Sequence, residues 1–243
     1  MSQDVILEAT GVNKHFGRLQ VLHGIDLQVR RGEALGVVGP NGAGKTTLFG
    51  VLAGTLPASS GSVRFNGAAI DTWDAPRRCR AGIARTHQVP RPFQGLSLYE
   101  NTLVAAQHGA ALRGREADEA VRHSLARCEL EHLAQRPAAS LGLMDRKRLE
   151  LARALATRPS LLLLDEIGGG LTEAELVTLS TLVASLRDEG LTVVWIEHVL
   201  HALLKVVTRL VCMDAGTVLA EGDPHAVMGD ARVIEAYLGG VAA

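Results

Sequence analysis

Hydrophobic and polar residues alternate along the first part of the chain, with the period of two that is typical of half-buried strands. The alternation is clearest in residues 5–7 and in Leu19–Val29. A further strand is expected at Ser62–Phe65, where Asn66 and Gly67 supply the turn that ends it. These strands predict an antiparallel β-subdomain near the N-terminus.

Uninterrupted apolar runs predict the buried strands of a second sheet. Ala34–Val38 is followed by the glycine-rich sequence GPNGAGKTT and by the apolar residues Leu48–Ala53, an order that predicts strand, turn and helix. Three more such strands are expected, at Leu161–Leu164, Thr192–Ile196 and Leu210–Met213. Thr172 and Glu175 have the spacing of a capping box, which begins a helix that ends near Gly190. Strands that alternate with helices imply a parallel sheet covered on both faces.

The middle of the chain has a helical pattern. From Tyr99 to Leu133 the sequence is rich in Ala and Leu, with charged residues on the opposite helical face. Pro137 ends this stretch, and a further helix is expected from Asp145 to Thr157, before Pro159. We therefore predict one domain over residues 1–243, with a core formed by 1–88 and 158–243 and a helical insertion over 89–157.

Composition supports a folded core and excludes some partners. The chain has 243 residues, of which 47% are hydrophobic, enough for one large domain with a well-buried interior. It carries 25 Lys and Arg against 26 Asp and Glu, so the formal net charge is -1. This balance argues against binding to nucleic acid through overall positive charge.

Cysteine spacing and hydropathy predict the cellular compartment of the protein. Cys79, Cys128 and Cys212 lie far apart without metal-ligand spacing, which favours a reducing cytosol. The start MSQDVILEAT lacks the blocks of a signal peptide, and no apolar run approaches the roughly 18 residues needed to cross a bilayer. We expect a soluble cytosolic protein that reaches a membrane only through a partner.

A phosphate-binding motif follows the first buried strand. The sequence GPNGAGKT fits GxxxxGK(S/T) in the strand-turn-helix context that this motif requires. Its glycines let backbone amides surround a β-phosphate, Lys45 supplies a positive charge for the β- and γ-oxygens, and Thr46 supplies a hydroxyl for Mg²⁺. The residues expected to bind ATP are Gly39, Pro40, Asn41, Gly42, Ala43, Gly44, Lys45, Thr46 and Thr47.

A second element places two carboxylates where such sheets bind ligands. Asp165 and Glu166 directly follow the buried strand Leu161–Leu164, at the carboxyl end of the predicted sheet. Two acids at a strand end are often only solvated, but the phosphate loop earlier in the chain favours a functional pair. Asp165 would hold Mg²⁺ through its water shell, and Glu166 would polarise the attacking water.

Three further residues are weaker candidates. His198 follows the strand TVVWIE and would reach the γ-phosphate at the same sheet edge, although a histidine at a strand end is usually structural. Gln88 lies between core and helical insertion, where it would contact Mg²⁺ or water; a loop glutamine is usually only solvated. Phe16 would stack on adenine or would simply belong to the core.

These residues, in this order, resemble the ATP-binding subunit of ABC transporters. Phe16, GPNGAGKTT, Gln88, LLLLDE and His198 match the A-loop, Walker A, Q-loop, Walker B and H-loop of that family, and the resemblance covers about residues 5–240. GIARTHQVPRPF, RKRLELARALATRPSLLLLDE, WIEHV and VIEAYLG are similar to the branched-chain amino acid subfamily. Related uptake systems for amides or urea share these stretches.

The resemblance implies a fold, partners and a mechanism. The fold would be that of a P-loop NTPase, with a RecA-like α/β core, an antiparallel β-subdomain and an inserted helical subdomain. Two ATP-binding subunits, as a homodimer or a heterodimer, would enclose ATP between one phosphate loop and the signature motif of the other subunit. Closure and hydrolysis would drive transmembrane permease subunits at the inner face of the membrane, and indirectly a solute-binding protein. The permease would dock near Gln88 and residues 91–98.

The sequence departs from the family at the signature motif. Where the family reads LSGGQ, this chain has Leu141-Gly142-Leu143-Met144-Asp145. Gly142 stands in place of the Ser hydroxyl and Met144 in place of the second Gly, which should weaken the site that this subunit completes. An alignment with a one-residue gap would instead give Ser140 the role of the Ser. Ile167, Thr172 and His87 stand where Pro, Asp and Phe are usual.

The expected function is ATP hydrolysis coupled to solute import, with branched-chain amino acids as the leading solute class. Glu166, His198 and Gln88 would form the catalytic group, Thr46, Gln88 and Asp165 would hold Mg²⁺, and Gly142 and Met144 would contact the nucleotide across the dimer. Intact Walker motifs beside a divergent signature suggest an asymmetric dimer. The alternatives are a regulatory subunit that hydrolyses ATP poorly, an importer of urea or amides, and a nucleotide switch unconnected with transport.

Overall fold

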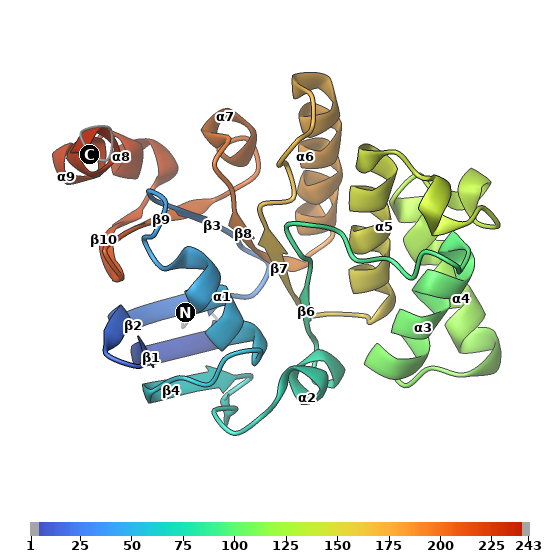
Figure 1. Ribbon diagram of the computed structural model, residues 1–243, viewed down its shortest axis with the longest axis horizontal. Coiled ribbons are helices and arrows are strands. Elements are labelled where there is room, and N and C mark those ends of the chain that lie inside the picture. Colours follow the sequence, from blue (N-terminus) through green and yellow to red (C-terminus); the bar gives the residue numbers. More distant parts are fainter. Residues whose placement is uncertain (1–4, 240–243) are drawn as a thin grey trace.

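Two β-sheets organise the fold of the computed structural model, which describes residues 5–239 (Figure 1). Residues 1–4 and 240–243, the two ends of the predicted domain, lie outside the described part. The smaller sheet is antiparallel and contains, in spatial order, β2 (Leu19–Arg30), β1 (Val5–Phe16), β4 (Ser60–Phe65) and β5 (Ala68–Ala69). Asn66 and Gly67 both have positive φ angles in the turn between β4 and β5, which confirms the predicted turn.

The larger sheet contains the expected buried strands. Its spatial order is β10 (Thr217–Gly222), β9 (Arg209–Asp214), β3 (Ala34–Val38), β8 (Thr192–Ile196), β7 (Leu161–Asp165) and β6 (Ile83–Arg85). All neighbouring pairs are parallel except β9 with β10. Every residue of β3, β7 and β8 is buried, because both faces of the sheet are covered. The predicted α/β class is confirmed.

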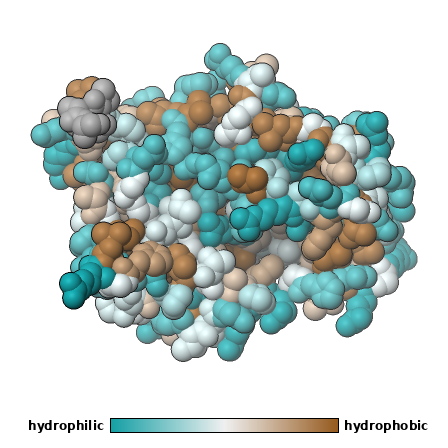
Figure 2. All heavy atoms as spheres, in the orientation of Figure 1, coloured by the Kyte–Doolittle hydropathy of each residue, from teal (hydrophilic) through white to brown (hydrophobic). Residues whose placement is uncertain are grey.

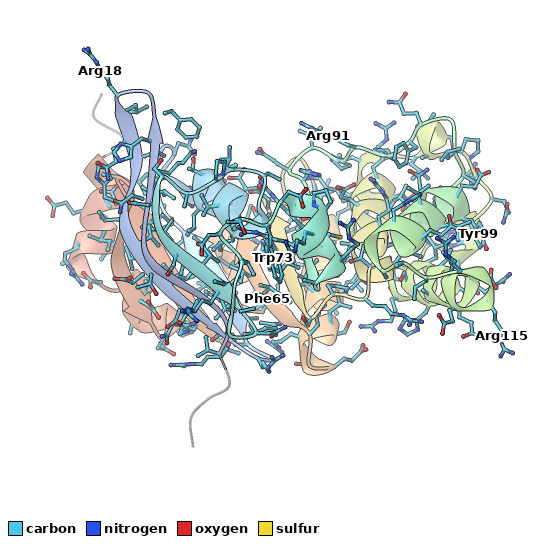
Figure 3. The ribbon with its side chains drawn as sticks, turned by 90° about the horizontal axis from the view of Figure 1, so that it is seen from below. Arg18, Phe65, Trp73, Arg91, Tyr99 and Arg115 are labelled. Carbon is cyan, nitrogen blue, oxygen red and sulfur yellow. The ribbon has the colours of Figure 1, made fainter. Side chains whose placement is uncertain are left out.

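Helices cover the larger sheet, and some of them form a helical region beyond one end of it. They are α1 (Lys45–Ala53), α2 (Ala75–Arg80), α3 (Leu98–Gly109), α4 (Gly114–Arg127), α5 (Leu143–Ala156), α6 (Glu173–Asp188), α7 (Leu200–Leu203), α8 (Pro224–Met228) and α9 (Ala231–Gly239). Helices α3, α4 and α5 pack on one another and form the helical end of the molecule, where Tyr99 and Arg115 lie (Figure 3). Arg18, in the turn between β1 and β2, marks the opposite end (Figure 3).

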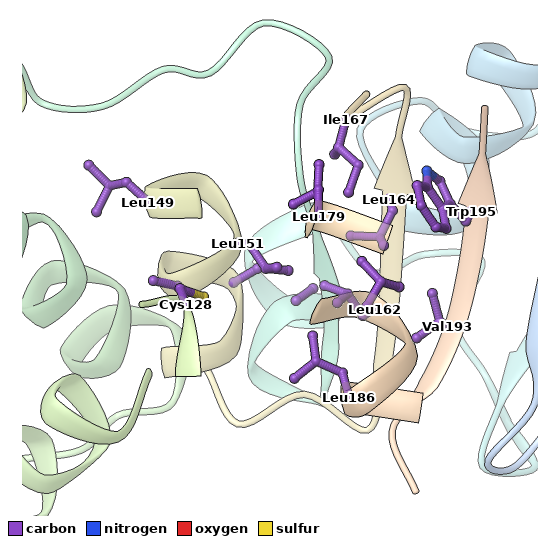
Figure 4. Close-up of a cluster of buried hydrophobic side chains, with 14 of the residues drawn as sticks. Cys128, Leu149, Leu151, Leu162, Leu164, Ile167, Leu179, Leu186, Val193 and Trp195 are labelled. Atoms are coloured by element: carbon purple, nitrogen blue, oxygen red, sulfur yellow. The ribbon is translucent and has the colours of Figure 1, made fainter. Parts of the chain in front are cut away.

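The hydrophobic core has two parts. One contains residues of both sheets and of α1, including Phe49, and the other contains residues of the larger sheet and of the helices α3 to α6, including Trp195. Figure 4 shows the second part, where side chains of β7, β8 and α6 continue toward α5. This continuity fixes the helical end to the sheet that carries the phosphate loop.

The surface mixes polar and apolar side chains on the face seen in Figure 2, and it is hollowed between the sheet side and the helical side of the molecule. Residues that line this hollow belong to α2, α3, α5, β6 and the segment after β6. Within residues 5–239, no helix is both long enough and apolar enough to span a membrane.

Candidate nucleotide-binding site

The phosphate loop connects the end of β3 to the start of α1. Gly44 precedes the helix with φ of 94°, a left-handed conformation that glycine adopts without strain, so the chain turns directly into the first helical residue Lys45. The first backbone amides of α1 have no partner inside the helix and favour an anion at this end. A cavity of about 260 Å³ opens here, lined by Val21, Asn41, Gly42, Ala43, Gly44, Lys45, Thr46, Thr47 and Glu166.

Lys45 is enclosed by the loop. It is 5% exposed, and its Nζ donates hydrogen bonds to the carbonyl oxygens of Gly39 at 2.8 Å and Pro40 at 2.9 Å. Burial lowers the pKa of Lys45, and the nearby negative charge of Glu166 partly opposes that shift. The ammonium group is thus held inside the cavity by weak neutral acceptors, which phosphate oxygens can replace with stronger, charge-assisted hydrogen bonds.

Glu166 is the centre of a three-residue cluster. Gln88 Nε2 donates to one carboxylate oxygen at 2.5 Å, and Nε2 of His198 lies 2.6 Å from the other. Glu166 itself has φ of 48°, an uncommon backbone conformation for a residue with a side chain. The structure therefore brings together three predicted residues from the segments that follow β6, β7 and β8, at the edge of the sheet where the cavity opens.

Asp165 and Thr46 carry oxygen atoms that are expected to bind Mg²⁺. Asp165 ends β7 with a side chain that is 4% exposed, and Arg85 Nη2 lies 2.6 Å from its Oδ2. Thr46 is exposed in the first turn of α1. Carboxylate and hydroxyl oxygens suit Mg²⁺, which usually takes one or two protein ligands and completes its shell with phosphates and water. The donor set fits that ion.

Phe16 does not line the cavity of the phosphate loop. It lies at the end of β1 with 46% of its surface exposed, so it is not a core residue, and Lys14 Nζ lies 5.0 Å from its ring centroid. Val21, on the neighbouring strand, lines the cavity instead. The adenine-stacking role of Phe16 stays a prediction.

Two buried charged residues support the cluster and were not among the predicted site residues. Lys147 of α5 donates to the backbone oxygen of Gln88 at 2.9 Å, and burial lowers its pKa. Glu197 is 2% exposed; its carboxylate accepts hydrogen bonds from the amides of Gly168 at 2.9 Å and His198 at 2.9 Å. Glu197 thereby ties together the segments that follow β7 and β8.

A sequence signal existed for each of these residues. Glu197 directly follows the buried strand β8, and an acid in that position has either to reach solvent or to find donors. Lys147 is one of four lysines in a chain that otherwise uses arginine, and its position between Arg146 and Arg148 resembles a solvated surface run. Only the packing of α5 against the strand ends reveals its partners.

The start of α5 contains the divergent signature residues. Gly142 is the N-cap, where no side chain accepts a hydrogen bond from the helix, and Asp145 adds a negative charge to the first turn. Leu143 is 42% exposed, whereas Met144 is half-buried against the helical core. Ser140 lies in the preceding turn, and its hydroxyl donates to the carbonyl of Pro137 at 2.8 Å. Gly142 and Met144 do not line the cavity of the phosphate loop in the same chain.

Two of the other departures have local structural roles. Ile167 is 4% exposed and packs in the cluster that contains Leu164, Leu179 and Trp195 (Figure 4). Thr172 caps α6 in a reciprocal capping box with Glu175, which confirms the predicted start of that helix. The apolar contacts of Ile167 and the capping hydroxyl of Thr172 account for these two residue types without reference to a ligand.

A phosphate loop, a strand that ends in Asp-Glu and a histidine at the next strand, all at one edge of a parallel sheet, define a P-loop nucleotide-binding protein. Residues 22–168 match the family described as ABC transporter, and residues 217–243 match the one described as branched-chain amino acid ATP-binding cassette transporter. The chain belongs to the ABC transporter family of ATP-binding proteins.

Individual relatives agree with this assignment. The chain is 36% identical to the high-affinity branched-chain amino acid transport ATP-binding protein BraF of Pseudomonas aeruginosa, over 96% of this chain and 98% of that protein. It is 34% identical to LivG of Escherichia coli, a protein described in the same words, over 98% and 99%. The ATP-binding cassette of an ABC transporter solved in its ADP conformation superposes with a TM-score of 0.89 at 30% identity, covering 97% and 99%.

Proposed function

We propose that this chain hydrolyses ATP to energise the import of branched-chain amino acids, as one of two ATP-binding subunits on the cytoplasmic face of a membrane permease. The observation that carries the solute class is the match of residues 217–243 to the branched-chain amino acid cassette family, since this segment lies outside the match to ABC transporters in general. Urea and amides are the competing solutes, and the external binding protein takes part only through the permease.

The Glu166 cluster supports hydrolysis. Glu166 acts as the base that orients and polarises a water toward the γ-phosphate, while His198 and Gln88 hold the two oxygens of its carboxylate. Lys45 and the loop amides stabilise the negative charge that develops on the phosphates. Thr46, Asp165 and Gln88 would hold Mg²⁺, which when bound would supply further neutralisation of that charge.

A groove beside the cluster supports a permease contact. It has a volume of about 360 Å³ and is lined by residues of α2, α3, α5, β6 and the segment after β6, among them Arg85, His87, Arg91 and Phe93. Arg85 lines the groove while its guanidinium pairs with Asp165 at 2.6 Å. A helix of the permease in this groove would therefore contact Arg85, which in turn contacts the Asp165 carboxylate that is expected to bind Mg²⁺.

The residues at the start of α5 favour a second candidate function, in which this subunit pairs with a different ATP-binding subunit. In the proposed dimer, Gly142 to Asp145 would face the phosphates held by the other subunit, yet this helix start offers no hydroxyl and carries a carboxylate. A negative side chain at that position opposes an anion that the helix dipole would otherwise attract. A regulatory role, with hydrolysis concentrated at one site of a heterodimer, is the alternative.

Reconstitution tests both parts of the proposal. The chain is purified together with the permease subunits that bind it, placed in liposomes with the external binding protein, and assayed for ATP hydrolysis with leucine, urea or acetamide. We expect stimulation by leucine alone, and no hydrolysis above background with Lys45→Ala. Stimulation by urea or acetamide instead would overturn the solute class but leave the ATPase assignment intact.

A further inference from the structure

A hydrogen bond connects the beginning of the phosphate loop to the last described helix. The backbone amide of Gly39 donates to the phenol oxygen of Tyr237 at 2.8 Å, although the two residues lie 198 positions apart. Gly39 follows directly after β3, and it is buried. A buried amide that leaves a strand has to find a new acceptor, and α9 provides it. In Figure 1, α9 lies beside α8 and β10 at the end of the chain.

Gly39 is fixed on its other sides as well. Its φ of 143° and the carbonyl oxygen of Met213, only 2.0 Å from where a Cβ would stand, leave room for glycine alone. The carbonyl oxygen of Gly39 accepts the 2.8 Å hydrogen bond from Lys45 Nζ. A single residue thus lies between the Tyr237 hydroxyl and the lysine that points into the nucleotide cavity.

Tyr237 is held firmly enough to act as a support. Val233, one turn earlier in α9, is fully buried in the core, and the ring of Tyr237 packs against the same cluster. The helix start is fixed by Asp230, which accepts hydrogen bonds from the Arg232 amide at 2.9 Å and pairs with its guanidinium at 2.6 Å. Burial raises the pKa of Tyr237, which keeps the phenol protonated near neutral pH.

We propose that Tyr237 is a positioning residue for nucleotide binding: its hydroxyl fixes the Gly39 amide and, through Gly39, the site of the Lys45 ammonium group. The inference deepens the proposed function, because it gives the segment that distinguishes the branched-chain subfamily a role at the ATP site. Tyr237 touches neither the cavity of the phosphate loop nor the Glu166 cluster, so its effect reaches ATP only through the loop.

The chain offers a matched pair of variants, since it has only two tyrosines. Tyr237→Phe removes the hydroxyl and keeps the ring. Tyr99→Phe removes a phenol hydrogen bond of similar length, 2.7 Å to Asp118, at the helical end of the molecule (Figure 3). We expect Tyr237→Phe to weaken the binding of MgATP about fivefold to tenfold, the effect of one lost hydrogen bond to a buried amide. Tyr99→Phe should bind MgATP as the natural chain does.

Calorimetric titration of each variant with MgATP gives the dissociation constant, and steady-state hydrolysis separates KM from kcat. Positioning predicts a rise in KM with kcat within about twofold, because the Glu166 cluster is unchanged. Amide hydrogen exchange should show faster exchange at Gly39 in Tyr237→Phe only. If both tyrosine variants bind MgATP equally well, the inference is wrong and Tyr237 serves only to anchor α9.

Lys45→Ala separates this outcome from a failure of the site itself. Loss of MgATP binding in Lys45→Ala, together with unchanged binding in Tyr237→Phe, overturns only the role of Tyr237. Retained binding in Lys45→Ala overturns the nucleotide site, and the inference with it. A melting temperature measured without nucleotide confirms that each variant is folded before it is titrated.

Discussion

The two surfaces with which this chain would contact ATP in a dimer differ sharply. At the carboxyl edge of the larger sheet, hydrogen bonds join Gln88, Glu166 and His198, and Lys45 lines the same cavity as Glu166. At the start of α5, the N-cap Gly142 offers no side-chain acceptor or donor. In the proposed dimer the same chain would therefore supply one surface with the expected reacting groups and another that depends on backbone amides, so the two halves of the composite site would have diverged separately.

The largest expected effect tests the stronger surface. Glu166→Gln should reduce hydrolysis by about 10²- to 10⁴-fold, since it removes the general base, while MgATP still binds. Light scattering after gel filtration with MgATP then reports on the weaker surface: a stable dimer means that Gly142 to Asp145 still functions, whereas a nucleotide-bound monomer means that a different partner is required. Glu173→Gln, an exposed glutamate on α6, should hydrolyse ATP normally. Undiminished turnover in Glu166→Gln would contradict the assignment of the base.

The buried support of the stronger surface gives the second largest effect. In Glu197→Gln, an NH₂ group replaces one of the two oxygens that accept backbone amides, so one donor is left unpaired. We expect the free energy of unfolding to fall by about 1–3 kcal/mol and turnover to fall about tenfold, measured by urea denaturation and steady-state hydrolysis. Glu33→Gln is the control, because Glu33 is a carboxylate paired with Arg209 that lies just before β3, at the end of that strand away from the phosphate loop. Lost stability with normal turnover would make Glu197 purely structural.

A substitution at the start of α5 should increase activity and thereby test the weaker of the two ATP-contacting surfaces. A Cβ at Gly142 would meet no atom within 4 Å, and its backbone conformation suits serine. Gly142→Ser should raise the turnover of a homodimer roughly threefold to tenfold by supplying a hydroxyl donor to a charged phosphate. Ser140→Ala tests the gapped alignment, in which its loss would lower turnover instead. No change in Gly142→Ser, in a sample shown to be dimeric, would contradict the proposed defect.

The smallest effect is a pH dependence. Burial lowers the pKa of Lys45 below its usual 10.5, and bound phosphates favour the charged form, so the pKa is higher in the complex. MgATP affinity is then complete below the lowered pKa and decreases as pH rises through it. Titrations between pH 7 and 10.5 should show this loss beginning below 10.5. Lys147→Met should retain it, because Lys147, a second lysine whose pKa is lowered by burial, is not its source. Disappearance of the loss in that variant would assign it to Lys147.

The sequence predicted the parts of the fold that rest on local patterns. Ala34–Val38 and Thr192–Ile196 have the bounds expected from their continuous apolar runs, since a strand covered on both faces contains little else. The strands β6 and β10 were not predicted. Ile83–Arg85 has only three residues, and Thr217–Gly222 is a half-exposed edge strand without a clear period of two.

The site was predictable where a motif places its members on consecutive elements, and not where distant segments make contact. Gln88, Glu166 and His198 follow three strands of one sheet, so topology alone brings them to one edge. The contacts of Lys147 and Tyr237 depend instead on how α5 and α9 pack, which no local pattern reports. In the sequence, Lys147 belongs to a basic run and Tyr237 to an amphipathic helix, so neither residue type marks a site.

The place of β3 in the larger sheet has a consequence for biosynthesis. Its two neighbours, β8 and β9, begin at Thr192 and Arg209, so the five apolar residues from Ala34 stay unpaired while most of the chain is translated. At about 5–20 residues per second, this interval lasts roughly 8 to 30 s. Short apolar windows without charge are prone to aggregate while they are exposed during folding. We therefore expect β3 to be covered by ribosome-associated chaperones during that time. A nascent chain arrested before Thr192 would have a phosphate-loop sequence without the sheet that shapes it.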